Sequence, residues 1–216
     1  MSDSILSQLD VLYPAVVADV LDAMGFPNQV LPHDIRPLTP QKKICGRVFT
    51  ARAEAVHEVP AEPYKLEIEA VESMSSGDVF LVSTGQDRTC GFWGELLTTA
   101  CLYKGVRGVV MDGCTRDLWK INELDFPVFG CGYHPADSKG RVDISEIQIE
   151  IRLGQVSIHP GDFLIGDEDG CVIIPAAQST EAVRLAMEKV SGENIARADL
   201  AAGVPMGTVF RKYGIL

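Results

Sequence analysis

Several common functional signals are missing from this chain of 216 residues. Its six cysteines form no C-x-x-C pair and its four histidines lie apart, which argues against a zinc site. There is no G-x-x-x-x-G-K phosphate loop and no G-x-G-x-x-G run, so nucleotide binding has little support. No apolar run approaches the roughly 20 residues that span a bilayer, so a membrane is not an expected partner.

The N-terminus and the charge balance exclude further classes. The first residues lack a basic segment followed by an apolar one, so we expect no secretory signal and a soluble, cytoplasmic protein with reduced cysteines packed as small core residues. Basic residues are scarce, since 19 Lys and Arg stand against 30 Asp and Glu, and the formal net charge is −11. Such a chain repels phosphate backbones, so nucleic acid is not an expected partner.

The hydrophobic pattern predicts an α/β protein. Composition is ordinary for a globular chain, no repeat or linker divides it, and we therefore expect one domain over residues 1–216. Helical spacing predicts a helix over 5–24 that is broken at Pro14, and alternation predicts a strand over 44–56. The remaining expected elements are a helix over 64–72, a strand over 79–83, a short helix over 118–124, a short strand over 127–131, an all-β segment over 142–175, and a last helix from an N-cap at Thr180 with a bend at Gly192.

Polar chemistry concentrates between Gly91 and Asp117. Gly94 precedes a helix predicted over 95–104, a strand is predicted over 106–112, and the polar turn GCTRD follows. Strand, helix and strand with short joints form a βαβ unit with parallel strands, so both polar turns emerge at the carboxyl ends of neighbouring strands. In open α/β sheets that edge is the usual ligand crevice. The sequence therefore predicts a ligand site there.

The residue types at this edge suit a carboxylic acid ligand. Exposed amides at a helix N-terminus, here those of Glu95, Leu96 and Leu97, bind small anions. Glu95 and Asp117 carry the hard oxygen ligands that Mg²⁺ or Mn²⁺ prefers. Arg116 carries a permanent charge that forks onto a carboxylate or enolate oxygen. An ion and an arginine together would stabilise an enolate formed next to a carbonyl.

A purely structural interpretation of the same residues stands beside this one. Glu95 could have only a structural role, because the helix dipole favours an acidic residue in the first turn. Arg116 and Asp117 are also a common type of surface ion pair. Likewise, Asp167–Gly170 resembles half a calcium loop, but without the full ligand spacing it is interpreted as a hairpin turn. Spacing alone does not separate the two interpretations of the edge.

The motifs themselves resemble a known family. The G-E-L of 94–96 and the R-D of 116–117, with VVMDGCTRD between, resemble the RraA-like family. That family includes 4-hydroxy-4-methyl-2-oxoglutarate aldolases and the regulator of ribonuclease E activity. VVADVLDAMG, ICGRVFTA, SSGDVFLV, HPGDFLIGDEDGCVIIP and ENIAR also fit, so the resemblance covers most of the chain. It implies a ββα layered sandwich of the swivelling, phosphohistidine-domain-like type, assembled as a homotrimer or homohexamer.

The resemblance also implies roles for individual residues. Asp117 would ligate Mg²⁺ or Mn²⁺ directly, and Glu95, where many members have aspartate, would hold a water on that ion. Arg116 would contact the oxo acid and lower the pKa of that water, while the backbone of Gly94, Glu95, Leu96 and Leu97 would hold the substrate carboxylate. Glu193 would complete the metal site from a neighbouring subunit, an assignment that the nearby Glu188 and Lys189 leave open by a turn.

Two functions follow as expectations. The first is a class II, divalent-metal-dependent aldolase that cleaves 4-hydroxy-2-oxo dicarboxylic acids such as 4-hydroxy-4-methyl-2-oxoglutarate to pyruvate and a second keto acid, with oxaloacetate decarboxylation as a further activity. The alternative is a non-catalytic regulator that binds a ribonuclease through protein contacts. A methyltransferase function lacks support because there is no glycine-rich cofactor loop. The loop around His134 and the segment 57–63 are expected to shape the distal part of the pocket.

Overall fold

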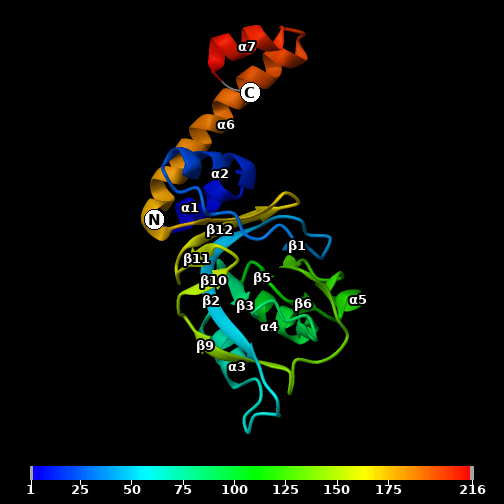
Figure 1. Ribbon diagram of the computed structural model, residues 1–216. Helices are drawn as coiled ribbons and strands as arrows, with labels where there is room; N and C mark the ends of the chain where they lie inside the picture. Colours follow the sequence, from blue (N-terminus) through cyan, green and yellow to red (C-terminus); the bar gives the residue numbers. More distant parts are fainter. Residues whose placement is uncertain (1, 215–216) are drawn as a thin grey trace.

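An eight-stranded sheet forms the centre of the computed structural model, which describes residues 2–214 (Figure 1). Its inner strands β2, β3, β5 and β7 are parallel to one another, whereas β12 and β9 both pair antiparallel with β2. In spatial order the strands are β1 (Arg36–Pro37), β7 (Val128–Gly130), β5 (Val109–Met111), β3 (Asp78–Ser83), β2 (Ile44–Ala55), β12 (Phe163–Asp167) and β13 (Gly170–Ile174), with β9 (Val142–Ile147) beside β2. The predicted α/β class is confirmed.

A second, three-stranded sheet corrects the predicted βαβ unit. The strand directly before the predicted helix is not β3 but β4 (Gly91–Trp93), which pairs parallel with β6 (Cys114–Thr115), and β6 pairs parallel with β8 (Gly132–Tyr133). The two polar turns therefore follow β4 and β6 rather than the strands of the large sheet. They still emerge from neighbouring parallel strands, as the sequence predicted. The strands β10 (Ile151–Leu153) and β11 (Val156–Ile158) form a separate hairpin.

The helices lie in two groups (Figure 1). The first group is α3 (Lys65–Ser73), α4 (Glu95–Lys104) and the short α5 (Leu118–Ile121), drawn in the lower half of the view. The second group is α1 (Ser2–Leu9), α2 (Pro14–Ala23), the 3₁₀ turn Ala176–Gln178, α6 (Ser179–Ala201) and α7 (Met206–Tyr213). In that group α6 and α7 extend away from the sheet at the top of the view. No helix within residues 2–214 combines the length and apolar character needed to cross a bilayer.

Several local predictions are confirmed and two are wrong. Pro14 does break the first helix, and it stands at the first position of α2, where its missing N–H costs nothing. The 167–170 segment is the turn of the β12–β13 hairpin. However, α6 begins at Ser179 without a side-chain cap from Thr180, and it runs unbroken through Gly192. A glycine costs a helix about 1 kcal/mol, which the packing of α6 on α1 and α2 outweighs.

Trp93 is the largest side chain that is fully buried, and it ties α4 to the small sheet. Its ring stacks on Phe126 at 6.0 Å between centroids, and its Nε1–H donates to Thr98 Oγ1 of α4 at 2.8 Å. Its carbonyl oxygen accepts the Arg116 N–H at 2.8 Å and the Thr115 hydroxyl at 3.0 Å. One residue at the end of β4 thus holds the helix and the next polar turn together.

The cysteines behave as core residues, as predicted. All six have free thiols, and all except the half-buried Cys131 are buried. Burial raises the pKa of the Cys45 thiol to about 12 and that of Cys90 to about 11, so neither is a thiolate near neutral pH. Burial also raises the pKa of Cys114 in the polar turn, so a nucleophilic role for it finds no support.

We expect Trp93→Ala to lower the free energy of unfolding by about 3–5 kcal/mol, because it leaves a cavity beside Phe126 and removes the hydrogen bond to Thr98. The other tryptophan, Trp119, is 74% exposed and is the matched control. Trp119→Ala should change stability by no more than about 0.5 kcal/mol. Urea unfolding followed by circular dichroism measures both, and equal losses in the two variants would contradict the central role of Trp93.

Candidate functional site

One cavity of about 300 Å³ collects the residues of both polar turns. Gly94, Glu95, Leu96 and Leu97 border it from the start of α4, and Arg116 and Asp117 border it from the turn after β6. Six residues that the sequence singled out are therefore brought together. The other lining residues are Tyr64, Glu67, Ile68, Phe92, Asp137 and Ser138.

The parallel pairing of β4 with β6 causes this convergence. Gly91 lies opposite Cys114 and Trp93 opposite Thr115, so the chain continues into Gly94 on one strand and Arg116 on the other at the same edge. A Cβ at position 94 would stand 2.8 Å from Asp117 Oδ2 and would displace that carboxylate. A glycine at this position leaves the Asp117 carboxylate room to lie against the start of α4.

Asp117 has an unusual backbone conformation that aims its side chain. Its φ of 59° is in the left-handed region, which residues other than glycine and asparagine or aspartate seldom adopt. The Glu95 N–H donates to its Oδ2 at 3.3 Å, and Arg116 Nε lies 3.5 Å from the same oxygen. The carboxylate is 39% exposed, so it is anchored and still accessible from the cavity. Residues held in such conformations cluster at functional sites.

The helix start keeps part of its predicted anion-binding capacity. The first turn of a helix leaves its N–H groups without intrahelical acceptors, and here Asp117 takes up the one from Glu95. The N–H groups of Leu96 and Leu97 stay available to a ligand. The Glu95 carboxylate is held against its own helix, because its Oε1 accepts a hydrogen bond from Thr99 at 3.0 Å. Its Oε2 has no partner among the described residues.

Sequence reasoning missed the network around Asp137. Its Oδ1 lies 3.2 Å from Arg116 Nη1, and its Oδ2 accepts the Tyr64 hydroxyl at 2.7 Å. Burial opposes the ionisation of Asp137, but the Tyr64 hydrogen bond and the Arg116 charge outweigh it and hold its pKa below the ordinary value. Burial and then Asp137 raise the pKa of Tyr64 to about 12. The 132–141 loop was expected to shape the pocket, and it does so through Asp137 and Ser138 rather than His134.

Glu67 is the second residue that the sequence analysis overlooked. It lies in the first turn of α3 and its side chain is only 5% exposed. Burial, reinforced by the charges of Asp143 and Asp137 and opposed by Arg116, raises the pKa of Glu67 to about 7. A signal was available: Glu67 precedes the inward-facing Ala70 and Val71 by three and four residues, which puts it on the buried face of the helix.

The residues in this cavity fit a metal that is held by few protein ligands. Within residues 2–214 no group of three or more His, Cys, Asp and Glu side chains is arranged to hold an ion. Mg²⁺, however, is commonly bound through one or two carboxylates together with waters and substrate oxygens. The accessible Asp117 carboxylate suits that mode, with Glu95 at the same edge.

Glu193 is not brought to this cavity within one chain. It lies on α6, which packs on α1 and α2, whereas α4 and β6 lie in the other half of the molecule (Figure 1). Its Oε2 accepts the hydroxyl of Tyr13 and lies 3.9 Å from Arg197 Nη2. Burial, followed by this hydrogen bond, raises the pKa of Tyr13. Glu193 thus has a structural partner of its own, and a role at the cavity requires a second chain.

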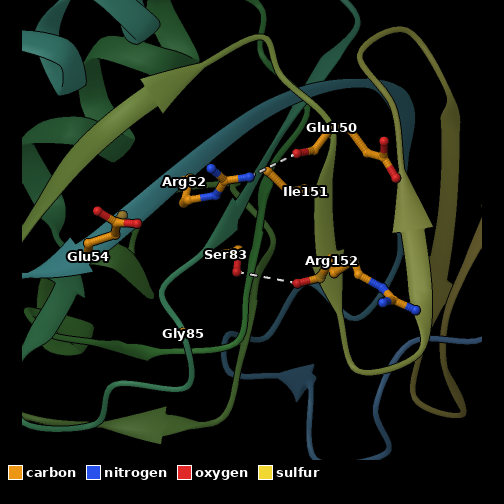
Figure 2. Close-up of a pocket in the computed structure, with 8 residues that line it drawn as sticks. Arg52, Glu54, Ser83, Gly85, Glu150, Ile151 and Arg152 are labelled. Carbon is orange, nitrogen blue, oxygen red and sulfur yellow. Dashed lines mark hydrogen bonds between the residues drawn. The ribbon is translucent and has the colours of Figure 1, made fainter.

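A larger cavity of about 470 Å³ lies beside β2, β3 and β10, but its polar groups do not converge (Figure 2). Arg52 is paired with Glu146 and donates to the Glu150 carbonyl at 3.2 Å. Ser83 Oγ donates to the Arg152 carbonyl at 3.3 Å, while the Arg152 guanidinium points away from Arg52 (Figure 2). The groups that remain form no arrangement with a recognisable chemistry, so the candidate site is the cavity of Arg116 and Asp117.

The chain is similar to known proteins over most of its length. A family model described as RraA-like, Aldolase/RraA, matches residues 15–173. A protein of Halalkalibacterium halodurans named putative 4-hydroxy-4-methyl-2-oxoglutarate aldolase is 29% identical over 184 residues, which are 85% of this chain and 82% of that protein. Protein DlpA of Legionella pneumophila is 28% identical over 193 residues, or 87% of this chain, and the alignment spans only 31% of DlpA.

A solved structure supports the architecture. A Streptomyces coelicolor protein, described as an unusual member of the RNase ES inhibitor RraA protein family, superposes with a TM-score of 0.80. Its sequence is 24% identical, and the match covers 90% of this chain and 97% of that one. At this identity the likeness establishes the fold.

The burial of Glu67 generates a prediction about stability and pH. Because its pKa is raised from about 4.5 to about 7, the folded state holds a proton that the unfolded state has lost, so its contribution to stability falls as pH rises through this window. Relative to Glu67→Gln, the wild type should lose roughly 3 kcal/mol between about pH 4.5 and pH 7. Urea unfolding across this range measures the difference. The exposed Glu69→Gln is the control, and parallel curves for Glu67→Gln and wild type would contradict the burial argument.

Proposed function

Because the chain belongs to the RraA-like family, we propose that it is a lyase that cleaves a carbon–carbon bond of a 2-oxo acid and releases pyruvate. The finer proposal is a class II aldolase for 4-hydroxy-2-oxo dicarboxylic acids such as 4-hydroxy-4-methyl-2-oxoglutarate, with oxaloacetate decarboxylation as a second activity. The name of the Halalkalibacterium relative supports the aldolase part. One observation carries the proposal: Arg116, the carboxylate of Asp117 and the open N-terminus of α4 border one cavity.

These groups divide the work of binding an oxo acid. The N–H groups of Leu96 and Leu97 would hold the substrate carboxylate at the start of α4. The Arg116 guanidinium would donate to the keto oxygen, where negative charge develops as the C3–C4 bond breaks. Asp137 and Asp117 hold that guanidinium in place from two sides, at 3.2 and 3.5 Å. Glu95 would orient the water that accepts the 4-hydroxyl proton, using the oxygen that Thr99 leaves free.

Asp117, aided by Glu95, would hold the divalent cation, Mg²⁺ or Mn²⁺. When bound, such an ion supplies Lewis-acid stabilisation of the negative charge on the enolate. Arg116, the neighbour of Asp117, would stabilise the same negative charge. This shared task would account for the position of both residues in one turn.

We also propose the architecture and assembly that the family resemblance implies. The layered sheet would be of the swivelling-domain type, and chains would associate as homotrimers or homohexamers. The second half of α6 supports this, because it extends away from the sheet (Figure 1) and leaves apolar residues such as Ile195 and Leu200 exposed to any chain that packs beside it. In this arrangement Glu193 of one chain would approach Asp117 of another.

We expect Asp117→Ala and Arg116→Ala each to abolish pyruvate release, because Asp117→Ala removes the carboxylate that would hold the divalent cation and Arg116→Ala removes the positive charge that would stabilise the enolate. Arg116→Lys keeps the charge but loses the planar fork, so it should retain only part of the activity. A lactate-dehydrogenase-coupled assay with a panel of oxo acids and Mg²⁺ or Mn²⁺ measures this. Asp169→Ala, in the exposed hairpin turn, is the control. Full activity in a metal-stripped preparation would contradict the metal-dependent mechanism.

Mixing two inactive variants tests whether Glu193 acts between chains. We expect Asp117→Ala and Glu193→Ala to be inactive alone. After co-expression or joint refolding, a mixed oligomer contains some sites with Asp117 from one chain and an intact Glu193 from the other. Pyruvate release should therefore return in the mixture, to a fraction of the wild-type rate. No recovery in verified mixed oligomers would show that Glu193 has only its structural role beside Tyr13.

The alternative is a regulator that binds a ribonuclease without catalysis. Two observations favour it: the net charge of −11 suits docking on a basic surface, and the Streptomyces protein of the same fold is described as belonging to an inhibitor family. Neither observation makes use of the cavity, whereas the lyase proposal does. Capture of a purified ribonuclease by a wild-type protein that releases pyruvate from no oxo acid would decide for the regulator.

A further inference from the structure

Glu67 is a carboxyl group that the proposed chemistry leaves without a task. It borders the cavity that also contains Arg116 and Asp117, and it is 5% exposed. No described residue forms a hydrogen bond with its carboxyl oxygens. Its oxygens are not among the fully buried atoms that lack a partner, so they are accessible from the cavity, and their hydrogen-bond partner arrives with solvent or ligand.

The reaction has a step that no other group has been assigned to. Bond cleavage leaves an enolate, and C3 of that enolate must receive a proton to become the methyl group of pyruvate. On the premise of the lyase function proposed above, we infer that Glu67 is the acid that delivers this proton. The electron pair of the enolate C2=C3 bond forms the new C3–H bond, the C2 carbonyl re-forms, and Glu67 is left as a carboxylate. Solvent water then returns the proton to Glu67.

The other acidic groups facing the cavity are poorly suited to this step. The Tyr64 hydroxyl donates a hydrogen bond to Asp137, and its pKa of about 12 makes it a weak acid. Asp137 has a lowered pKa and is engaged by Arg116, so it carries no proton to give. Asp117 and Glu95 have other proposed tasks, at the cation and at the water, and each already accepts a hydrogen bond, from the Glu95 N–H and from Thr99.

The surroundings of Glu67 are those of a working acid. Burial, with Asp143 on β9 and Asp137 on the cavity loop, favours the protonated form, and Arg116 opposes it, with the balance near pH 7. An acid whose pKa is close to the working pH both delivers and regains its proton readily. Two carboxyl groups of one cavity, Glu67 and Asp137, thus have pKa values shifted in opposite directions, the pattern by which acid and base assignments are recognised.

The kinetic test compares Glu67→Gln, which keeps the shape and removes the proton, with Glu69→Gln, an exposed neighbour on α3. We expect Glu67→Gln to lower kcat for pyruvate release roughly 10²-fold or more while KM changes little. Glu67→Asp, which keeps an acid, should recover part of the rate. Exchange of the pyruvate methyl protons in D₂O, followed by NMR, reports the same proton transfer in reverse and should slow by a similar factor.

A binding measurement gives a readout that does not depend on turnover. Oxalate is a planar dianion that imitates the pyruvate enolate, so its binding with Mg²⁺ should draw a proton onto Glu67. Calorimetry at about pH 8 in buffers of different ionisation enthalpy should show proton uptake for wild type and Glu69→Gln, and none for Glu67→Gln.

The outcomes separate this inference from the function on which it rests. A wild type that releases no pyruvate from any oxo acid overturns the lyase function and the proton donor with it. An active wild type with Glu67→Gln equally active, or with the same proton uptake on binding oxalate, overturns the role of Glu67 alone.

Discussion

The site depends on the pairing of two very short strands. β4 and β6 together hold five residues, yet their parallel alignment places Gly94 beside Arg116 and so determines where the helix start meets the charged turn. Trp93 secures this alignment, because its carbonyl accepts hydrogen bonds from both Thr115 and Arg116 while its ring is fully buried against Phe126. Loss of that alignment would separate the two polar turns without changing either sequence motif.

Around this pairing, the cavity is built as a set of opposed charges. Among the described residues Arg116 is the one cation that lines it, and four carboxylic side chains border the same space: Glu67, Glu95, Asp117 and Asp137. An excess of acid at one site is costly unless the groups are paired, hydrogen-bonded, protonated or bound to a cation. The structure meets this demand differently for each: Asp137 is paired and hydrogen-bonded, Asp117 and Glu95 accept hydrogen bonds, and burial raises the pKa of Glu67, which favours its neutral form. A divalent cation at Asp117 would reduce the remaining repulsion between the carboxylates.

The second polar feature that the resemblance implied, Glu193, is organised by a different principle. It lies on a helix of 23 residues whose first half packs on α1 and α2 and whose second half extends beyond them. Apolar residues on that extension and on α7, such as Ile195, Leu200 and Phe210, are exposed. A projecting helix with exposed apolar side chains is typical of an element that packs against another chain. Assembly and completion of the site would then be one event.

Local sequence determined individual turns and helix ends, whereas the tertiary structure decided which residues lie together in the cavity. The glycine before α4, the break at Pro14 and the hairpin at 167–170 are short-range effects of backbone preference, and all were predictable. The identity of the strand before α4, the unbroken α6 and the place of Tyr64 and Asp137 at the cavity were not, and for Glu67 helical spacing indicated burial but not the cavity. These depend on long-range pairing and on burial, which bring together residues from 64 to 138 that no spacing along the chain relates. The pKa of a buried carboxyl is set by its charged neighbours in space, and for Glu67 only the fold brings Asp143, Asp137 and Arg116 close.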